Sequence, residues 1–334
     1  MIDPVYSPAP DRYDSGMTYR RCGRSGILLP AISLGLWHNF GDVDPLAESL
    51  RKAHFAFDRG ITHFDLANNY GPSYGSAEDT FGIIMRKSFA PFRDELFIST
   101  KAGHDMWPGP YGNWGSRKYL MASLDQSLKR MNLDYVDVFY SHRYDPETPI
   151  EETLQALVDI VRAGKALYVG ISKYPRDKAE YAYGYLAERD VPCLLYQGRY
   201  NIFNREPEDH GIIADARAKG VGFIAFSPLA QGLLTNRYLN GIPADSRIAR
   251  GGYLKEDALT GTTLDMIRRL NDLAARRGQT LAEMSLAWLL RDKAVTSVIV
   301  GASSVAQLDD NLKALRNTAF SPEELAEIDA ITGR

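Results

Sequence analysis

Residues 136–171 read VDVFYSHRYDPETPIEETLQALVDIVRAGKALYVGI, which is two short apolar runs with a helical pattern between them. The two runs are residues 136–140 and 166–171. A capping box at 148–151 (Thr-Pro-Ile-Glu) has proline at the first helical position, and apolar residues then recur at helical spacing until Gly164. The stretch therefore predicts a strand, a helix and a second strand, which is the unit of a parallel sheet.

Similar apolar runs recur along the whole chain, each followed by a helical pattern. They lie at residues 31–35, 62–66, 96–100, 136–140, 166–171, 194–197, 222–226 and 297–300. Most are almost continuously apolar, as strands buried on both faces are, so the eight units predict a closed (β/α)8 TIM barrel. The alternative is an open doubly wound sheet that binds a nucleotide at a glycine-rich first turn. Because no G-x-G-x-x-G or Walker motif follows a run, the closed barrel is favoured.

The remaining segments fit around one barrel domain. Residues 19–21 and 27–29 flank a Gly-Arg-Ser-Gly turn and predict a β-hairpin that plugs the bottom of the barrel. A long loop, 230–261, follows the seventh strand, and a loop of that length in a compact domain is usually functional or disordered. The expected organisation is an N-terminal extension, 1–16, and a single domain, 17–334.

Composition excludes several classes of partner. The chain has 334 residues, a net charge of −3 and no tract of Lys or Arg, so nucleic acid and anionic membranes are poor candidates. It has no apolar stretch near the roughly 18 residues of a membrane span, and residues 1–16 lack the apolar core of a signal peptide. Cys22 and Cys193 show no metal-ligand spacing and are expected to be free thiols. The expected location is therefore the cytoplasm, with no metal site.

Polar residues stand where three of the apolar runs end. Asp65 and Tyr70 follow the second run, Lys101 the third and His142 the fourth. Each alone reads as an ordinary cap, surface or packing residue. Because the carboxyl ends of barrel strands meet at one rim, the four are expected to converge on a catalytic site.

This combination suits the reduction of a carbonyl group. A buried Lys101 needs a partner, and Asp65 supplies one. The ammonium of Lys101 should lower the pKa of Tyr70 from about 10 toward the working pH, which would make the phenol a better general acid. His142 can hydrogen-bond the substrate carbonyl and orient it for hydride attack.

At these residues the sequence resembles the aldo-keto reductases, whose catalytic residues are Asp, Tyr, Lys and His. The motifs that carry the resemblance are Asp65-x-x-x-x-Tyr70-Gly71, Ser99-Thr100-Lys101 and Tyr140-x-His142-x-x-Asp145. The likeness extends from residue 19 to 330. It implies a (β/α)8 barrel that binds NADPH in extended form without a glycine-rich fingerprint. It also makes a homo-oligomer possible, either a tetramer or an octamer.

The resemblance also implies which residues hold the cofactor. Ser172 and Gln197 stand where relatives bind the nicotinamide carboxamide, Lys173 replaces the usual Asn, and Phe226 stands where an aromatic ring stacks on the nicotinamide. Ser303 could reach the 2′-phosphate, which favours NADPH over NADH. The full implied set is Trp37, Asp65, Ser172, Lys173, Gln197, Phe226, Ser227, Pro228, Leu229, Gly232, Arg237, Arg247, Gly301, Ser303, Gln307, Asp310 and Asn311.

Within the family, Trp37 and the segments 241–247, 301–303 and 106–118 resemble one branch. It contains bacterial L-glyceraldehyde 3-phosphate reductases and β-subunits of voltage-gated potassium channels. Aromatic residues in segment 106–118 predict a small pocket, suited to L-glyceraldehyde 3-phosphate or methylglyoxal. Either Arg143 or His38 could bind the phosphate, although Arg143 could equally be a solvated loop residue. The expected substrate contacts are Trp37, His38, Tyr70, Trp107, Tyr111, Trp114, His142 and Arg143.

Two other functions remain open at this point. A regulatory subunit that senses its cofactor, like the potassium-channel β-subunits, would keep the same four residues. The short segment before the hairpin favours an enzyme, since a gating subunit often carries a longer tail. A reductase of broad aldehyde detoxification would share every motif named above.

Overall fold

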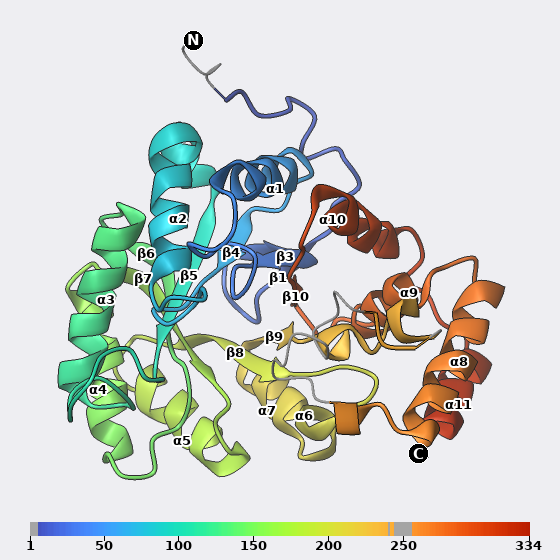
Figure 1. The fold of residues 1–334 in the computed structure, drawn as a ribbon. Helices are drawn as coiled ribbons and strands as arrows, with labels where there is room; N and C mark the ends of the chain where they lie inside the picture. Colours follow the sequence, from blue (N-terminus) through green and yellow to red (C-terminus); the bar gives the residue numbers. More distant parts are fainter. Residues whose placement is uncertain (1–5, 240, 244–255) are drawn as a thin grey trace.

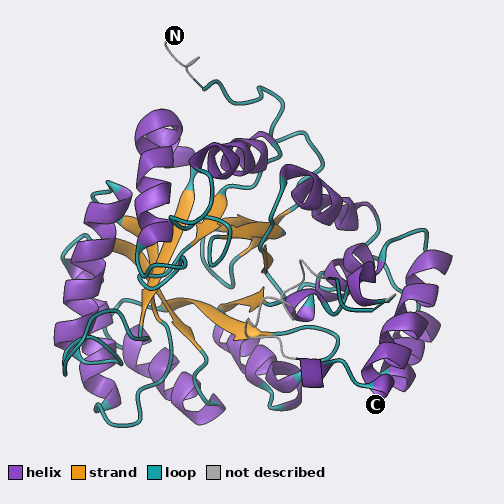
Figure 2. Ribbon diagram, viewed as in Figure 1, coloured by secondary structure: helices purple, strands orange, loops and turns teal. Residues whose placement is uncertain are grey.

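A computed structural model describes residues 6–239, 241–243 and 256–334. Eight parallel strands form a closed barrel in the order β10-β3-β4-β5-β6-β7-β8-β9. Figure 1 and Figure 2 show these strands at the centre, with helices around them. The barrel strands are β3 (Ile32–Gly35), β4 (His63–Asp65), β5 (Phe97–Ala102), β6 (Val136–Ser141), β7 (Ala166–Ser172), β8 (Cys193–Arg199), β9 (Gly222–Phe226) and β10 (Ser297–Val300). The predicted (β/α)8 barrel is confirmed.

The helices follow the strands in the alternating order that the sequence predicts. Capping explains several helix starts, since the Thr280 and Ser321 side chains each accept the N3 amide of a complete capping box. The helices are α1 (Leu46–Asp58), α2 (Ser76–Ile84), α3 (Arg117–Met131), α4 (Ile150–Arg162), α5 (Arg176–Ala187), α6 (Glu206–Asp209), α7 (Ile212–Lys219), α8 (Gly261–Arg276), α9 (Leu281–Leu289), α10 (Val305–Leu312) and α11 (Pro322–Ile331).

Alternation along each strand separates two kinds of core. Outward-facing side chains such as Ile98 pack under the helices in one large apolar cluster. The inward-facing residues of β4 and β5 are polar, and Ser99 and Lys101 both bond Asp65 across the strand pair. The barrel interior is therefore polar where these two strands meet, and that is where the candidate site begins.

A two-stranded hairpin closes the amino-terminal end of the barrel. It consists of β1 (Tyr19–Arg21) and β2 (Leu28–Pro30), which pair antiparallel. Between them, Cys22 is fully buried and its thiol lies 3.3 Å from the carbonyl oxygen of Leu194. At the turn, a Cβ on Gly23 would lie 1.9 Å from the carbonyl oxygen of Gly220, so only glycine fits there. The predicted hairpin is confirmed.

The remaining segments lie on the outside of the barrel. In the N-terminal extension, Tyr6 stacks on His54 of α1 with ring centroids 3.9 Å apart. After β9 the chain makes short 3₁₀ turns at Ala230–Gly232 and Asn236–Tyr238. Among the residues described, no helix is long and apolar enough to cross a membrane.

Candidate active site

Four polar side chains meet at the carboxyl ends of three neighbouring strands. Asp65 is the last residue of β4, Lys101 lies near the end of β5, and His142 directly follows β6. Lys101 Nζ donates to Asp65 Oδ2 at 2.6 Å and to Tyr70 Oη at 3.2 Å. The rings of Tyr70 and His142 stand edge to face, with centroids 5.9 Å apart. The structure thus brings together the four residues that the sequence singles out.

The Lys101–Asp65 pair is sealed from water and has fixed partners. The two side chains are 0% and 2% exposed, and the Lys101 ammonium also donates to the carbonyl oxygen of Leu66 at 2.6 Å. Burial alone would lower the pKa of Lys101, but the charge of Asp65 and the hydrogen bonds to Asp65 and Tyr70 outweigh it and leave the pKa raised. Lys101 is therefore a permanent cation beside the Tyr70 hydroxyl.

The Tyr70 hydroxyl is more basic than the sequence predicts. Its burial raises its pKa above the ordinary 10.0, and the opposing attraction of Lys101 is the smaller effect. The expectation that Lys101 brings this pKa below 10 is wrong in its net direction, although Lys101 does act in the predicted sense. A raised pKa keeps Tyr70 protonated at neutral pH, as a proton donor requires.

His142 is neutral in this environment. Burial and the nearby cations Lys173 and Lys101 hold its pKa well below 6.5. Among the described residues its Nδ1 has no hydrogen-bond partner. His104 stands edge-on to it, with ring centroids 4.5 Å apart. A neutral imidazole can donate one hydrogen bond to a carbonyl oxygen without carrying a charge.

Below the site, a chain of buried hydrogen bonds runs through the barrel interior. Ser99 Oγ donates to Asp65 Oδ1 at 2.7 Å, and Gln197 Nε2 donates to the same oxygen at 3.1 Å. His63 joins Ser99 at 3.0 Å to Ser33 at 2.8 Å. Burial lowers the pKa of His63 to about 4, so it is neutral. Sequence reasoning gave Ser33 and His63 no role, although His63 stands two positions before Asp65 on β4 and Ser33 lies on the neighbouring strand β3.

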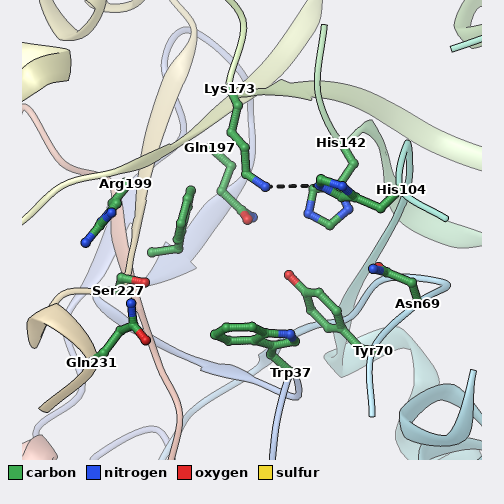
Figure 3. Close-up of a pocket in the computed structure, with 11 residues that line it drawn as sticks. Trp37, Asn69, Tyr70, His104, His142, Lys173, Gln197, Arg199, Ser227 and Gln231 are labelled. Carbon is green, nitrogen blue, oxygen red and sulfur yellow. Dashed lines mark hydrogen bonds between the residues drawn. The ribbon is translucent and has the colours of Figure 1, made fainter. Parts of the chain in front are cut away.

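A cavity of about 270 Å³ opens beside the four residues (Figure 3). The Tyr70 hydroxyl, the His142 ring and the Lys173 ammonium point into it from different sides. Its lining among the described residues contains no carboxylate. The lining residues are Trp37, Asn69, Tyr70, His104, His142, Lys173, Gln197, Arg199, Phe226, Ser227 and Gln231.

A second hollow, of about 270 Å³, continues from the first and shares its Trp37, Tyr70 and Phe226 walls. It runs from Asp65 to the turn after β10 and contains most of the residues that the sequence assigns to a cofactor. Those on its wall are Trp37, Asp65, Phe226, Ser227, Pro228, Leu229, Gly232, Arg237, Gly301, Ser303 and Gln307. The structure also places His38 here rather than in the first cavity.

Two buried polar atoms belong to residues that the sequence assigns to the cofactor. Among the described residues, Ser172 Oγ and Asn311 Nδ2 are buried without a hydrogen-bond partner, although neither residue lines the described groove. Such atoms are costly unless a ligand satisfies them. Ser227, which follows β9, has a left-handed backbone with φ +53°. A strained non-glycine backbone of this kind is common where a loop holds a ligand.

Three cofactor assignments have less structural support. Asp310 forms an ion pair with Lys313 at 2.5 Å and does not line the described groove. Arg247 lies outside the described residues. Lys173 projects into the first cavity, next to His104, instead of the groove.

Four of the predicted substrate residues lie away from the described cavity wall. Trp107 packs against the Tyr119 ring at 5.0 Å, and Tyr111 is 55% exposed. Trp107 and Trp114 line a separate surface hollow. Arg143 donates to Gly103 O and to Asn113 Oδ1, and its guanidinium lies 3.5 Å above the Trp114 ring. The expectation that Trp107, Tyr111 and Trp114 form the wall of the substrate pocket is therefore corrected, because the structure places none of them on the wall of the described cavity.

Four cavity residues were missed by the sequence reasoning: Asn69, His104, Arg199 and Gln231. Of these, His104 stands three positions after Lys101, and Arg199 two positions after Gln197. Arg199 is the last residue of β8 and His104 closely follows β5, so both lie at the carboxyl end of a barrel strand, which is the signal that could have found them.

Known proteins resemble the chain along most of its length. Residues 31–332 match the Aldo/keto reductase family. An L-glyceraldehyde 3-phosphate reductase of Escherichia coli O157:H7 is 57% identical over 329 residues, which are 97% of this chain and 95% of the relative. Its counterpart in Escherichia coli K12 is 56% identical over 329 residues, with the same coverage. A probable voltage-gated potassium channel subunit beta of Oryza sativa subsp. japonica is 35% identical over 322 residues, 94% and 96% of the two chains.

Proposed function

Because the chain belongs to the aldo/keto reductase family, we propose that it reduces a small aldehyde to the alcohol with NADPH. L-Glyceraldehyde 3-phosphate is the proposed substrate, with methylglyoxal as a second. The observation that carries the proposal is the contact of the buried Lys101–Asp65 pair with the Tyr70 hydroxyl at 3.2 Å, at the wall of an open cavity.

The residues of the groove, together with the buried Ser172 and with Gln197 of the first cavity, fit the proposed cofactor. Ser172 and Gln197 would hold the nicotinamide carboxamide, and Phe226 would stack on the ring. Residues 227–229 with Gly232 and Arg237 would follow the pyrophosphate, and Ser303 with Gln307 the adenosine end. When bound, NADPH supplies the hydride.

The chemistry of the chain itself is proton donation and orientation. Neutral His142 donates a hydrogen bond to the substrate carbonyl oxygen and fixes its direction. As negative charge develops on that oxygen, Tyr70 Oη gives up its proton to it. Lys101 stabilises the resulting phenolate, and Asp65 holds Lys101 in place. Positioned proton transfer of this kind contributes about 10²–10⁴-fold to a rate.

The test is the rate of NADPH oxidation with a panel of aldehydes. We expect the highest kcat/KM with L-glyceraldehyde 3-phosphate, measurable turnover with methylglyoxal and little with bulky ketones. Equal kcat/KM across all short aldehydes would instead assign a broad detoxification enzyme. No turnover of any aldehyde, with NADPH bound, would favour a cofactor-sensing subunit.

A further inference from the structure

The substrate cavity contains two cations that have no counterion within the described chain. Lys173 Nζ has His104 Nε2, at 3.2 Å, as its hydrogen-bond partner, and it lies 5.6 Å from the Phe226 ring centroid. Arg199 also lines the cavity and forms no ion pair with a described residue. The other cation at the site, Lys101, is neutralised by Asp65. The cavity is therefore electropositive before a substrate enters.

The bond to His104 holds Lys173 in place but leaves two of the hydrogen-bond donors of its ammonium unused. The pKa of His104 falls to about 3 through burial and the nearby Lys173, so the ring is neutral and its Nε2 can accept a bond from the ammonium. An ammonium has three donors, of which this bond uses one. The two that remain face a cavity without a described carboxylate.

The backbone also directs Lys173 into the cavity. It follows the last residue of β7 and has φ +55°, a left-handed conformation that side-chain-bearing residues rarely adopt. Its amide donates to the carbonyl oxygen of Gln197 at 3.3 Å, which ties this turn to β8. Figure 3 shows the ammonium reaching toward the His104 and His142 rings, on the side where the Tyr70 hydroxyl also points.

Resting on the function proposed above, we propose that Lys173, positioned by His104, binds the phosphate of the substrate. In a three-carbon aldehyde phosphate the phosphate is separated from the carbonyl carbon by two carbons and one ester oxygen. It must therefore lie close to Tyr70 and His142 when the carbonyl binds there. Arg143, the other candidate, is held by Gly103 and Asn113 of the loop after β5.

The first test measures binding without turnover. The probe is glycerol 3-phosphate, titrated calorimetrically into the wild type, Lys173→Met and Lys178→Met. Lys178 is a matched control because it lies on the same strand–helix unit, is paired with Asp177 and does not line the described cavity. We expect the Kd to rise roughly 10- to 100-fold in Lys173→Met alone, the range for a hydrogen bond to a charged group. A Kd in Lys173→Met equal to that of the wild type would overturn the proposal.

The second test separates the phosphate from the rest of the substrate. Glyceraldehyde and glyceraldehyde 3-phosphate differ only in that group. In Lys173→Met, kcat/KM should therefore fall for glyceraldehyde 3-phosphate and stay unchanged for glyceraldehyde. Lys173→Arg should restore part of the loss, since it keeps the charge. Equal losses on both substrates, or weaker NADPH binding by fluorescence titration, would make Lys173 a cofactor or structural residue instead.

The two tests fail separately from the proposed function. If the wild type prefers another aldehyde but its affinity for glycerol 3-phosphate depends on Lys173, the phosphate site stands and the substrate assignment falls. If the wild type prefers glyceraldehyde 3-phosphate and Lys173→Met keeps that preference, the function stands and this site falls.

Discussion

Two lysines at the ends of nearby strands occupy opposite environments. Lys101 on β5 is fully buried, and its ammonium has three partners, Asp65, Leu66 O and Tyr70. Lys173 after β7 is exposed to the cavity, and its hydrogen-bond partner is the neutral His104. A buried charge that is paired within the protein holds the catalytic residues in place. A charge without a counterion indicates a ligand that supplies the opposite charge. We call the first region the floor (Asp65, Tyr70, Lys101) and the second the rim (His104, Lys173).

The largest expected effect is on catalysis at the floor. Tyr70→Phe removes the proton donor and should lower kcat about 10²–10⁴-fold. Because the hydroxyl alone is lost, NADPH should bind as it does to the wild type. Single-turnover kinetics and fluorescence titration measure the two quantities. A variant with undiminished kcat would remove Tyr70 from the mechanism.

The second prediction contrasts the two lysines through stability. Lys101→Met leaves Asp65 buried without its cation, which typically costs about 3–5 kcal/mol of the free energy of unfolding. Lys173→Met removes an exposed charge and should change that free energy by less than about 0.5 kcal/mol. Urea unfolding of both variants at pH 7 measures the difference. Similar losses in the two would show that the floor and the rim are not distinct in the way described.

The third prediction concerns the neutral histidine beneath the floor. Because its pKa is lowered to about 4 in the folded chain, from 6.5, the unfolded chain binds a proton first as the pH falls. Its contribution to stability is present above pH 6.5 and is lost between pH 6.5 and 4. At about 1.4 kcal/mol per pKa unit the loss is on the order of 3 kcal/mol.

The measurement is the free energy of unfolding at several pH values in the wild type and in His63→Asn. The asparagine keeps polar atoms near Ser33 and Ser99 but does not titrate in this window. The difference between the two curves should shrink as the pH falls from 6.5 to 4. Parallel curves would mean that His63 is protonated in the folded chain.

The fourth prediction extends the comparison to the outer end of the groove, where Ser303 is exposed. NADPH should bind about tenfold more tightly than NADH, because it carries one further phosphate. The gap should narrow as salt is added, since an exposed phosphate is screened. Fluorescence titration with both cofactors is the measurement. Equal dissociation constants at low salt would show that the adenosine end has been misassigned.

The smallest expected effect is at Arg143. Two of its five N–H donors bond Gly103 O and Asn113 Oδ1, and its guanidinium stacks on Trp114. Arg143→Ala should therefore loosen this contact between loops rather than unbind a phosphate. We expect kcat/KM to fall by no more than about 1 kcal/mol, equally for methylglyoxal and glyceraldehyde 3-phosphate. A loss confined to glyceraldehyde 3-phosphate would move the phosphate site from Lys173 to Arg143.

The barrel and the floor could be predicted from sequence because each depends on local order along the chain. Apolar runs set the strands, and a polar residue at the end of a run must lie at the carboxyl end of the barrel. Asp65 and Lys101 could be placed that way without knowing any loop. Their pairing followed from the cost of burying either charge alone.

The rim and the pKa of Tyr70 could not be predicted in this way. Whether Arg143 or Lys173 reaches the cavity depends on which contacts the loops form with one another. Arg143 stacks on Trp114 and bonds Asn113, and these contacts keep it out of the cavity wall. The sign of the Tyr70 pKa shift depends on how far burial outweighs one neighbouring charge. Both are balances between effects of similar size, and neither leaves a pattern in the order of residues.

The groove crosses the place where the barrel closes. β3 and β10 are separated by most of the chain, yet Ile32 pairs with Val298, and Ser33 Oγ lies 2.6 Å from Ser297 Oγ. Gly35 and Val300, from the two sides of this seam, both line the groove. The binding site therefore cannot exist until the last strand has docked on the first, so it should be among the late structures to assemble during folding. A ligand that contacts both β3 and β10 would oppose the separation of these two strands and should therefore raise the melting temperature.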